Sequence, residues 1–225
     1  MNVIYTAISK NYDRLWPHPP IKECQFIAFV DNPEKIPDEG WELRKLVPFH
    51  KDAVRNSKKY KVLAHEIFPH AKYSLWVDGN ITIQNNFNLD SLIGEYLTRH
   101  DIALFKHRKR ICSYAEADTC LRCGLDNSKI INKQIFKYLS EGYPKNHGLT
   151  ENRTILRRHT PKIAQLENTW WKEICEGSRR DQLSLNYSMW KSGRSFAIRP
   201  GTSLHNPFFK GNKHLCDHRR FMVLP

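Results

Sequence analysis

Cysteine is scarce in this chain, with six in 225 residues. So few thiols exclude a small scaffold held together by disulfides. The chain also lacks any apolar run that approaches the roughly 20 residues of a membrane-spanning helix. Residues 1–9 lack the basic start and the long apolar stretch of a signal peptide. We therefore expect a soluble cytoplasmic protein whose cysteines are reduced.

Acidic residues are also in deficit. The chain has 23 Asp and Glu against 36 Lys and Arg, which gives a net charge of +13. A positive field of this size favours anionic partners, which include nucleic acid, an anionic membrane surface and a phosphorylated substrate. Charge alone does not choose among them, so a basic nucleic-acid-binding module and a peripheral membrane contact both stay open.

No repeat and no low-complexity linker divides the sequence, and its length fits one domain spanning residues 1–225. Apolar β-branched runs alternate with segments of helical periodicity. Strands are expected at 3–9, 25–30, 73–77, 102–105, 155–158 and 195–198, and helices at 53–68, 89–97, 130–139, 161–175 and 181–190. This alternation predicts an α/β fold with a central sheet flanked by helices.

The segment with the clearest chemistry is WVDGN at 76–80, where an apolar strand runs into a polar tip. Asp78 and Asn80 can each offer an oxygen ligand to a hard cation such as Mg²⁺ or Mn²⁺. Gly79 lets a ligand approach the main chain, and open α/β sheets bind ligands beyond the carboxyl ends of their strands. The alternative is a hairpin turn, because Asp-Gly is a strong turn signal, and local spacing alone favours the turn.

Four blocks in fixed order and spacing resemble one protein family. The blocks are YSLWVDGN at 73–80, the spaced set His107, Arg110, Cys112, Tyr114 and Glu116, GLTEN at 148–152 followed by ILRRH at 155–159, and SRRDQLS at 178–184. They are similar to the glycosyltransferase-like domains of plant Golgi proteins and of bacterial and viral polysaccharide-modifying proteins. The resemblance extends from about Arg55 to about Tyr187.

The resemblance implies a GT-A-like nucleotide-sugar transferase domain with a central, mostly parallel mixed sheet. Asp78 and Asn80 stand where related enzymes carry an Asp-x-Asp pair that binds Mn²⁺ or Mg²⁺. Asn80 is a departure, because it is a neutral and weaker ligand. In related enzymes a C-terminal His completes the metal site, so His205 is the expected third ligand and His214 the reserve. The alternative is that the C-terminal segment is a solvated basic tail.

The donor site is expected at the ends of the first strands and beside the metal. Cations on the helix before the Asp78 strand could neutralise a diphosphate, although they could equally form the solvated face of that helix. The first strand ends would hold the base and ribose, and C-terminal lysines would touch the diphosphate. The expected donor-binding residues are Thr6, Ala7, Asp31, Arg55, Lys58, Lys59, Val77, Asp78, Lys210 and Lys213.

Asp181 and Gln182 are the expected catalytic residues. A carboxylate at the start of helix 181–190 could act as a general base or orient the substrate, whereas the alternative is an N-terminal helix cap. A polar acceptor wall is expected to include a pair between Arg110 and Glu116, although the basic run at 107–110 read alone suggests nucleic acid. The expected acceptor-binding residues are His107, Arg110, Tyr114, Glu116, Glu151, Asn152, Arg157 and His159.

The predicted activity is sugar transfer from a nucleoside diphosphate to a hydroxyl of a glycan, polysaccharide, lipopolysaccharide or other lipid-linked acceptor. Its rivals are the nucleic-acid-binding module, a metal-dependent hydrolase using Asp78, His107 and His159, and a binding protein without activity. Cys120 and Cys123 could also begin a zinc site with Cys112, His214, Cys216 or His218. Buried thiols are the favoured interpretation of that motif.

Overall fold

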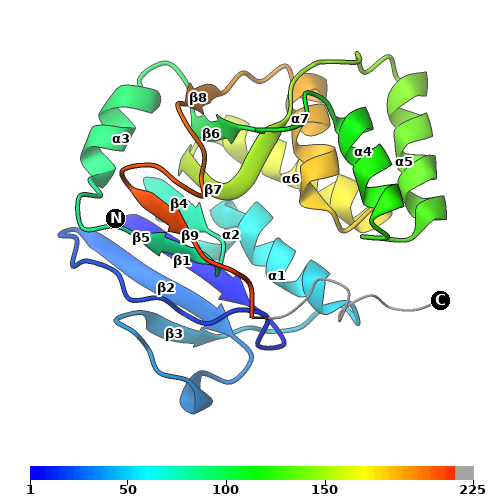
Figure 1. Ribbon diagram of the computed structural model, residues 1–225. Helices are drawn as coiled ribbons and strands as arrows, with labels where there is room; N and C mark the ends of the chain where they lie inside the picture. The colour runs from blue at the N-terminus through cyan, green and yellow to red at the C-terminus, as the bar shows by residue number, and fades with distance from the viewer. Residues whose placement is uncertain (216–225) are drawn as a thin grey trace.

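A seven-stranded sheet forms the centre of the computed structural model, which describes residues 1–215 (Figure 1). In spatial order its strands are β3 (Glu42–Lys45), β2 (Cys24–Val30), β1 (Asn2–Ile8), β4 (Tyr73–Val77), β7 (Thr150–Arg158), β6 (Ile102–Lys106) and β8 (Ala197–Arg199). β3, β2, β1 and β4 are mutually parallel, β7 is antiparallel to β4 and β6, and β8 is parallel to β6. This confirms the predicted mixed, mostly parallel sheet of a GT-A-like domain.

A small second sheet and seven α-helices surround the central sheet in the described part of the chain (Figure 1). The second sheet pairs β5 (Ile81–Ile83) with β9 (Phe209–Gly211). The helices are α1 (Ala53–Val62), α2 (Ala64–Ile67), α3 (Leu89–Tyr96), α4 (Ser113–Arg122), α5 (Ser128–Ser140), α6 (Pro161–Glu176) and α7 (Asp181–Lys191), with a 3₁₀ turn η1 (Pro33–Lys35). Within residues 1–215 no helix has both the length and the apolar character that crossing a bilayer requires.

The central strands β1, β4 and β7 bury both of their faces, as expected for a sheet covered on two sides. On β1, Val3 and Tyr5 pack with α1, α2, α6 and α7, whereas Ile4 and Ile8 pack with α3, β5 and β9. Side chains alternate between the two faces of a strand, so each residue's position along β1 or β4 decides which layer it meets. This alternation directs the functional side chains described below.

Most of the predicted elements are present, but the helix expected at 53–68 is two helices that meet at Leu63. The amide of His65 donates to the carboxylate of Glu167 at 3.0 Å instead of to the Lys61 carbonyl. Arg157 donates to that carbonyl at 2.8 Å. Tertiary hydrogen bonds thus replace helical ones at the break. Strand β7 begins five residues before its predicted start at 155, and β3, α4 and β9 were not predicted.

The ion pair of Arg157 and Glu167 is almost fully buried, and its loss is our first prediction. Arg157 Nε lies 3.2 Å from Glu167 Oε1, with side chains 0% and 2% exposed. Glu167→Gln leaves the arginine charge uncompensated, and we expect a loss of about 3–5 kcal/mol in the free energy of unfolding. Denaturant unfolding measures it. The control is Glu176→Gln, which breaks an exposed pair with Lys172 and should cost about 0–1 kcal/mol. Equal losses would contradict the assignment.

Candidate active site

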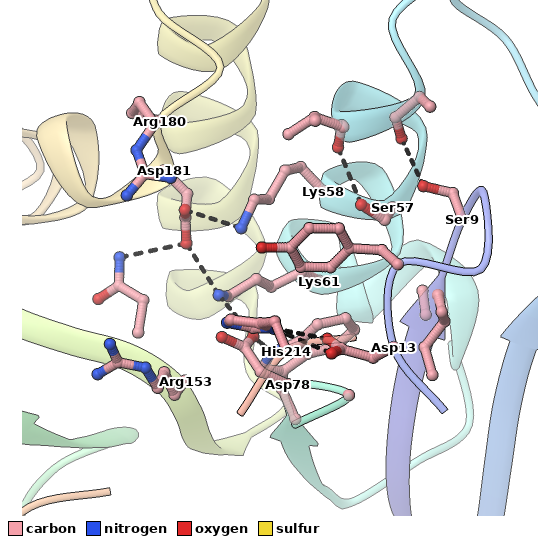
Figure 2. Close-up of a pocket in the computed structure, with 18 of the residues that line it drawn as sticks. Ser9, Asp13, Ser57, Lys58, Lys61, Asp78, Arg153, Arg180, Asp181 and His214 are labelled. Carbon is pink, nitrogen blue, oxygen red and sulfur yellow. Dashed lines mark hydrogen bonds and ion pairs between the residues drawn. The ribbon is translucent and has the colours of Figure 1, made fainter. Parts of the chain in front are cut away.

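A cleft opens at the edge where β1 and β4 end (Figure 2). Because these strands are parallel and adjacent, their carboxyl ends deliver side chains to the same edge of the sheet. Residues of α1, β7 and the start of α7 form the other walls. The lining includes Ala7, Ser9, Tyr12, Asp13, Ser57, Lys58, Lys61, Trp76, Asp78, Gly79, Asn152, Arg153, Arg180, Asp181, Gln182 and His214.

Two lysines and two aspartates form the centre of the cleft (Figure 2). Lys61 Nζ lies 3.0 Å from Asp78 Oδ1 and 2.9 Å from Asp181 Oδ2. Lys58 Nζ lies 2.9 Å from the other oxygen, Oδ1, of Asp181. These contacts connect α1 with the end of β4 and the start of α7.

Strand and helix periodicity explain why these groups meet. Trp76 faces the α1 side of the sheet, and Asp78, two residues later, points the same way. The Trp76 indole donates to Asp78 Oδ1 at 2.7 Å, which fixes the carboxylate. On α1, Lys58 and Lys61 are three residues apart and therefore share one helical face.

Burial and charge act against each other at this centre. Burial disfavours ionisation of Asp78 and Asp181, but the nearby ammonium groups of Lys58 and Lys61 outweigh it and hold both carboxyl pKa values below the ordinary range. Burial also disfavours the charged form of Lys61, yet Asp181 and Asp78 raise the Lys61 pKa. At Lys58 burial prevails and lowers the pKa. At neutral pH the two carboxylates therefore face a firmly held ammonium group.

The turn after β4 also determines how the loop after β1 packs beside the cleft. The amide of Ile81 donates to the Asp78 carbonyl at 2.9 Å, so the predicted turn is present. It does not close a hairpin, because β5 pairs with β9 and not with β4. A Cβ atom on Gly79 would lie 3.0 Å from side-chain atoms of Asp13 and Ile8. Glycine is therefore required for the loop after β1 to pack against this turn.

The wall formed by β7 and α7 contains amide and guanidinium groups. Asn152 Nδ2 lies 3.5 Å from Asp181 Oδ2, and Gln182 donates to the Thr150 carbonyl at 3.1 Å. Arg153 follows Asn152, with its side chain 37% exposed. The buried Nε of Arg180 has no hydrogen-bond partner among the described residues. This wall can donate hydrogen bonds to an anion or to sugar hydroxyls.

A second hollow adjoins the cleft and shares Ile8 and Asp13 with it. Asp31 lines this hollow at the end of β2 and accepts a hydrogen bond from the Lys10 amide at 2.5 Å. Of the other residues expected at the first strand ends, Ala7 lines the cleft itself. Thr6 is 2% exposed and lines neither hollow.

The predicted ion ligands do not converge. Oδ1 of Asp78 already accepts from Lys61 and Trp76, whereas Asn80 is absent from the cleft lining and donates to the Asn212 carbonyl at 3.0 Å. His205 is exposed and also outside the lining. Within residues 1–215 no group of three or more His, Cys, Asp or Glu side chains could hold a metal ion. The side chains as placed therefore do not fit the predicted Mn²⁺ or Mg²⁺.

The reserve ligand His214 and the cysteine motif at 120–123 likewise do not converge with other predicted metal ligands in the described part of the chain. His214 does line the cleft, but its Nδ1 lies 3.0 Å from both carboxylate oxygens of Asp13. Cys120 and Cys112 are buried and Cys123 is exposed, so the motif provides no convergent thiols within the described residues. Cys216 and His218 lie outside the described residues.

The four predicted donor-binding cations other than Lys58 lie away from the cleft. Arg55 donates to the carbonyls of Ile174 and Gly177 and so ties α1 to the end of α6. The Lys59 ammonium lies 5.2 Å from the centre of the Phe49 ring. Lys210 and Lys213 are exposed and absent from the lining. Val77 is buried and does not line the cleft. Of the predicted cations on α1, Lys58 alone reaches the site.

The predicted acceptor wall divides into two groups. The predicted pair of Arg110 and Glu116 is present. His107 bonds to Arg110, and Tyr114 donates to the Tyr143 carbonyl. Glu116 is also close enough to act on the charge of the Arg180 guanidinium, so this cluster stands behind the cleft wall. Of the remaining predicted acceptor residues, only Asn152 lines the cleft. Glu151 accepts from Thr202 and Ser203. Arg157 pairs with Glu167, and His159 contacts Ser74.

The predicted hydrolase site is not assembled, because neither His107 nor His159 lines the cleft that holds Asp78. Sequence analysis also missed Lys61, Arg153 and Arg180. Lys61 carried a usable signal, because it follows Lys58 by three residues and thus shares its helical face. The other two needed knowledge of how β7 and α7 pack against β4.

Two comparisons with known proteins bear on this site. The family model described as TOD1/MUCI70, glycosyltransferase-like domain, matches residues 42–213. The protein "Probable hexosyltransferase MUCI70" of Arabidopsis thaliana is 29% identical over 147 residues, which cover 61% of this chain and 25% of that protein. This chain thus matches only about a quarter of the relative's length. The family match includes Lys58, Lys61, Asp78 and Asp181 at the centre of the cleft.

The pH dependence of stability tests whether His159 is buried away from the cleft. Burial is the main reason that its pKa falls from 6.5 to about 4, and Arg157 and His65 add to the decrease. Between these pH values the unfolded chain binds a proton that the folded chain does not, so stability should fall as the pH drops from 6.5 towards 4. Unfolding free energies of wild type and His159→Gln measure this, and the variant should show the shallower decline. Parallel curves would place His159 in a solvated position.

Proposed function

This chain belongs to the TOD1/MUCI70 glycosyltransferase-like domain family, and we propose that it is a hexosyltransferase-like enzyme. It moves a sugar from a nucleoside-diphosphate donor to a hydroxyl group of a glycan. The observation that carries this proposal is the placement of Lys58, Lys61, Asp78 and Asp181 in one cleft at the carboxyl ends of β1 and β4. Such a transfer needs cations near the diphosphate and a carboxylate near the sugar.

The donor lies across the ends of the first strands. Its base and ribose occupy the hollow beside Asp31, and its diphosphate lies in the cleft next to Asp78. Ile8 and Asp13 line both hollows, so the two lie next to each other along the ends of the first strands, as one extended ligand requires. No step of this proposal uses a divalent ion, because the described side chains do not fit the predicted ion site.

Asp181 acts on the sugar through its negative charge. Two lysines hold its pKa far below the ordinary range, so it is a weak proton acceptor and a poor general base. Negative charge beside a sugar that becomes positive in the transition state lowers the barrier. Asn152 and the lysines orient the carboxylate, and Gln182 next to it offers hydrogen bonds to sugar or acceptor hydroxyls.

The acceptor approaches from the side of β7 and α7, where amide and guanidinium groups line the cleft. These groups suit a hydroxyl-rich glycan, either as a polysaccharide or as a lipid-linked oligosaccharide. The cluster of Arg110 and Glu116 behind Arg180 supports this wall from outside.

The proposal is tested by a screen of sugar nucleotides for thermal stabilisation and for slow hydrolysis of the donor. At least one donor should raise the melting temperature and turn over. Asp181→Asn should lower turnover about 100-fold or more, because it removes an electrostatic contribution of a few kcal/mol. The matched control is Asp118→Asn at an exposed position on α4, which should keep wild-type turnover. If no sugar nucleotide binds or turns over in the wild type, the proposed function is wrong.

A further inference from the structure

The charged groups of the cleft indicate how this site holds a diphosphate. The inference drawn from them rests on the proposed function. Four cationic side chains line the cleft, namely Lys58, Lys61, Arg153 and Arg180, together with the carboxylates of Asp13, Asp78 and Asp181. The two lysines are paired with Asp78 and Asp181, and Asp13 is paired with His214. Within the described part of the chain, neither arginine forms an ion pair with any of these three carboxylates.

Lys61 and Trp76 occupy Oδ1 of Asp78, one of the two oxygens that a divalent ion could bind. The Lys61 ammonium lies 3.0 Å from Asp78 Oδ1 and 2.9 Å from Asp181 Oδ2, and the residue is only 1% exposed. This ammonium group cannot turn out into solvent without leaving Asp78 without its ion-pair partner and Asp181 with Lys58 alone. A second cation on Asp78 would meet this ammonium at close range, and like charges repel strongly where water is scarce.

Of the other expected ion ligands, Asn80 Nδ2 and the His214 ring are bonded to the protein, whereas Asn80 Oδ1 is buried without a partner among residues 1–215 and His205 is exposed outside the cleft. Asn80 bonds to the backbone of Asn212 in the segment after β9, and Asn212 in turn donates to the Asn80 carbonyl at 2.7 Å. These bonds hold Asn80 on the β5 side of the turn, outside the cleft lining. His214 is held by Asp13. Binding an ion at Asp78 with these ligands would require several hydrogen bonds to break.

Arg153 and Arg180 are placed where they can neutralise the diphosphate, which is the role predicted for the divalent ion. The Asp78 amide donates to the Arg153 carbonyl at 2.8 Å, so Arg153 is the direct neighbour of Asp78 across the sheet. Its nearest carboxylate, Glu151, is 3.9 Å away and accepts from Thr202 and Ser203. Arg180 has an unpartnered buried Nε. Guanidinium groups suit phosphate because they donate two parallel hydrogen bonds and always carry charge.

We infer that the cleft binds the diphosphate through Lys61, Arg153 and Arg180, without a divalent cation. Lys61 provides fixed positive charge at the floor, and the two arginines donate to the phosphate oxygens from the β7 and α7 wall. The Asp78 carboxylate positions Lys61 and is not a metal ligand.

The test is isothermal titration of UDP, GDP, ADP and CDP into the whole chain, once with excess EDTA and once with Mn²⁺. The nucleotide that binds most tightly should have the same Kd in both buffers. Arg153→Gln should weaken its binding at least about tenfold in both, because charge-assisted hydrogen bonds to phosphate are lost. The matched control is Arg44→Gln, since Arg44 is 40% exposed, lies beside Glu42 and is outside the cleft; its Kd should not change.

The outcomes separate the two claims. Binding that requires Mn²⁺, or an unchanged Kd in Arg153→Gln, overturns the inference and leaves the proposed function standing. If none of the four nucleotides binds in either buffer, both fall. Lys61→Met is a weaker probe, because it removes the counter-charge of Asp78 and one of the two ammonium groups beside Asp181, and so destabilises the fold. Arg153→Gln is the deciding variant, since its side chain is 37% exposed and its loss is tolerated by the core.

Discussion

The ammonium group of Lys61 joins the parts of the molecule that form the cleft. Its side chain bridges Asp78 at the end of β4 and Asp181 at the start of α7, while Arg157 and Tyr5 hold its backbone carbonyl from β7 and β1. A buried charge is costly unless it is paired, so the fold must place both carboxylates correctly. The relative positions of α1, β4 and α7 follow from this requirement. Figure 2 shows Lys61 between Asp78 and Asp181.

This constraint also prepares the site for chemistry. The charges that a departing diphosphate and a developing sugar cation need are already ordered, so little reorganisation is required during the reaction. The antiparallel strand β7 contributes to this order in two ways. Its buried Arg157 anchors the end of α1, and its other end places Asn152 and Arg153 beside Asp181 and Asp78.

The sequence predicted the features that depend on local pattern. Apolar β-branched runs identified β1, β2 and β4, and family resemblance singled out Asp78 and Asp181, which the fold brings together. Features that depend on tertiary contacts were missed or misplaced. The break at Leu63 arises from hydrogen bonds to Glu167 and Arg157, which lie about a hundred residues away. Likewise, helical spacing places Lys61 on the same face as Lys58, but no local feature shows that this face enters the cleft while Lys59 packs on Phe49. The ligand set of Asn80 and His205 was carried over from relatives, and neither side chain lines the cleft.

The central claim is that the cleft around Lys61 holds the diphosphate of a sugar nucleotide. A crystal structure of the chain with a bound nucleoside diphosphate tests it most directly. The account predicts that the base lies near Asp31 and that phosphate oxygens lie within hydrogen-bonding distance of Lys61 and Arg153. A nucleotide bound at another surface, or a diphosphate in the cleft held through an ion on Asp78 after Lys61 has been displaced, would contradict it.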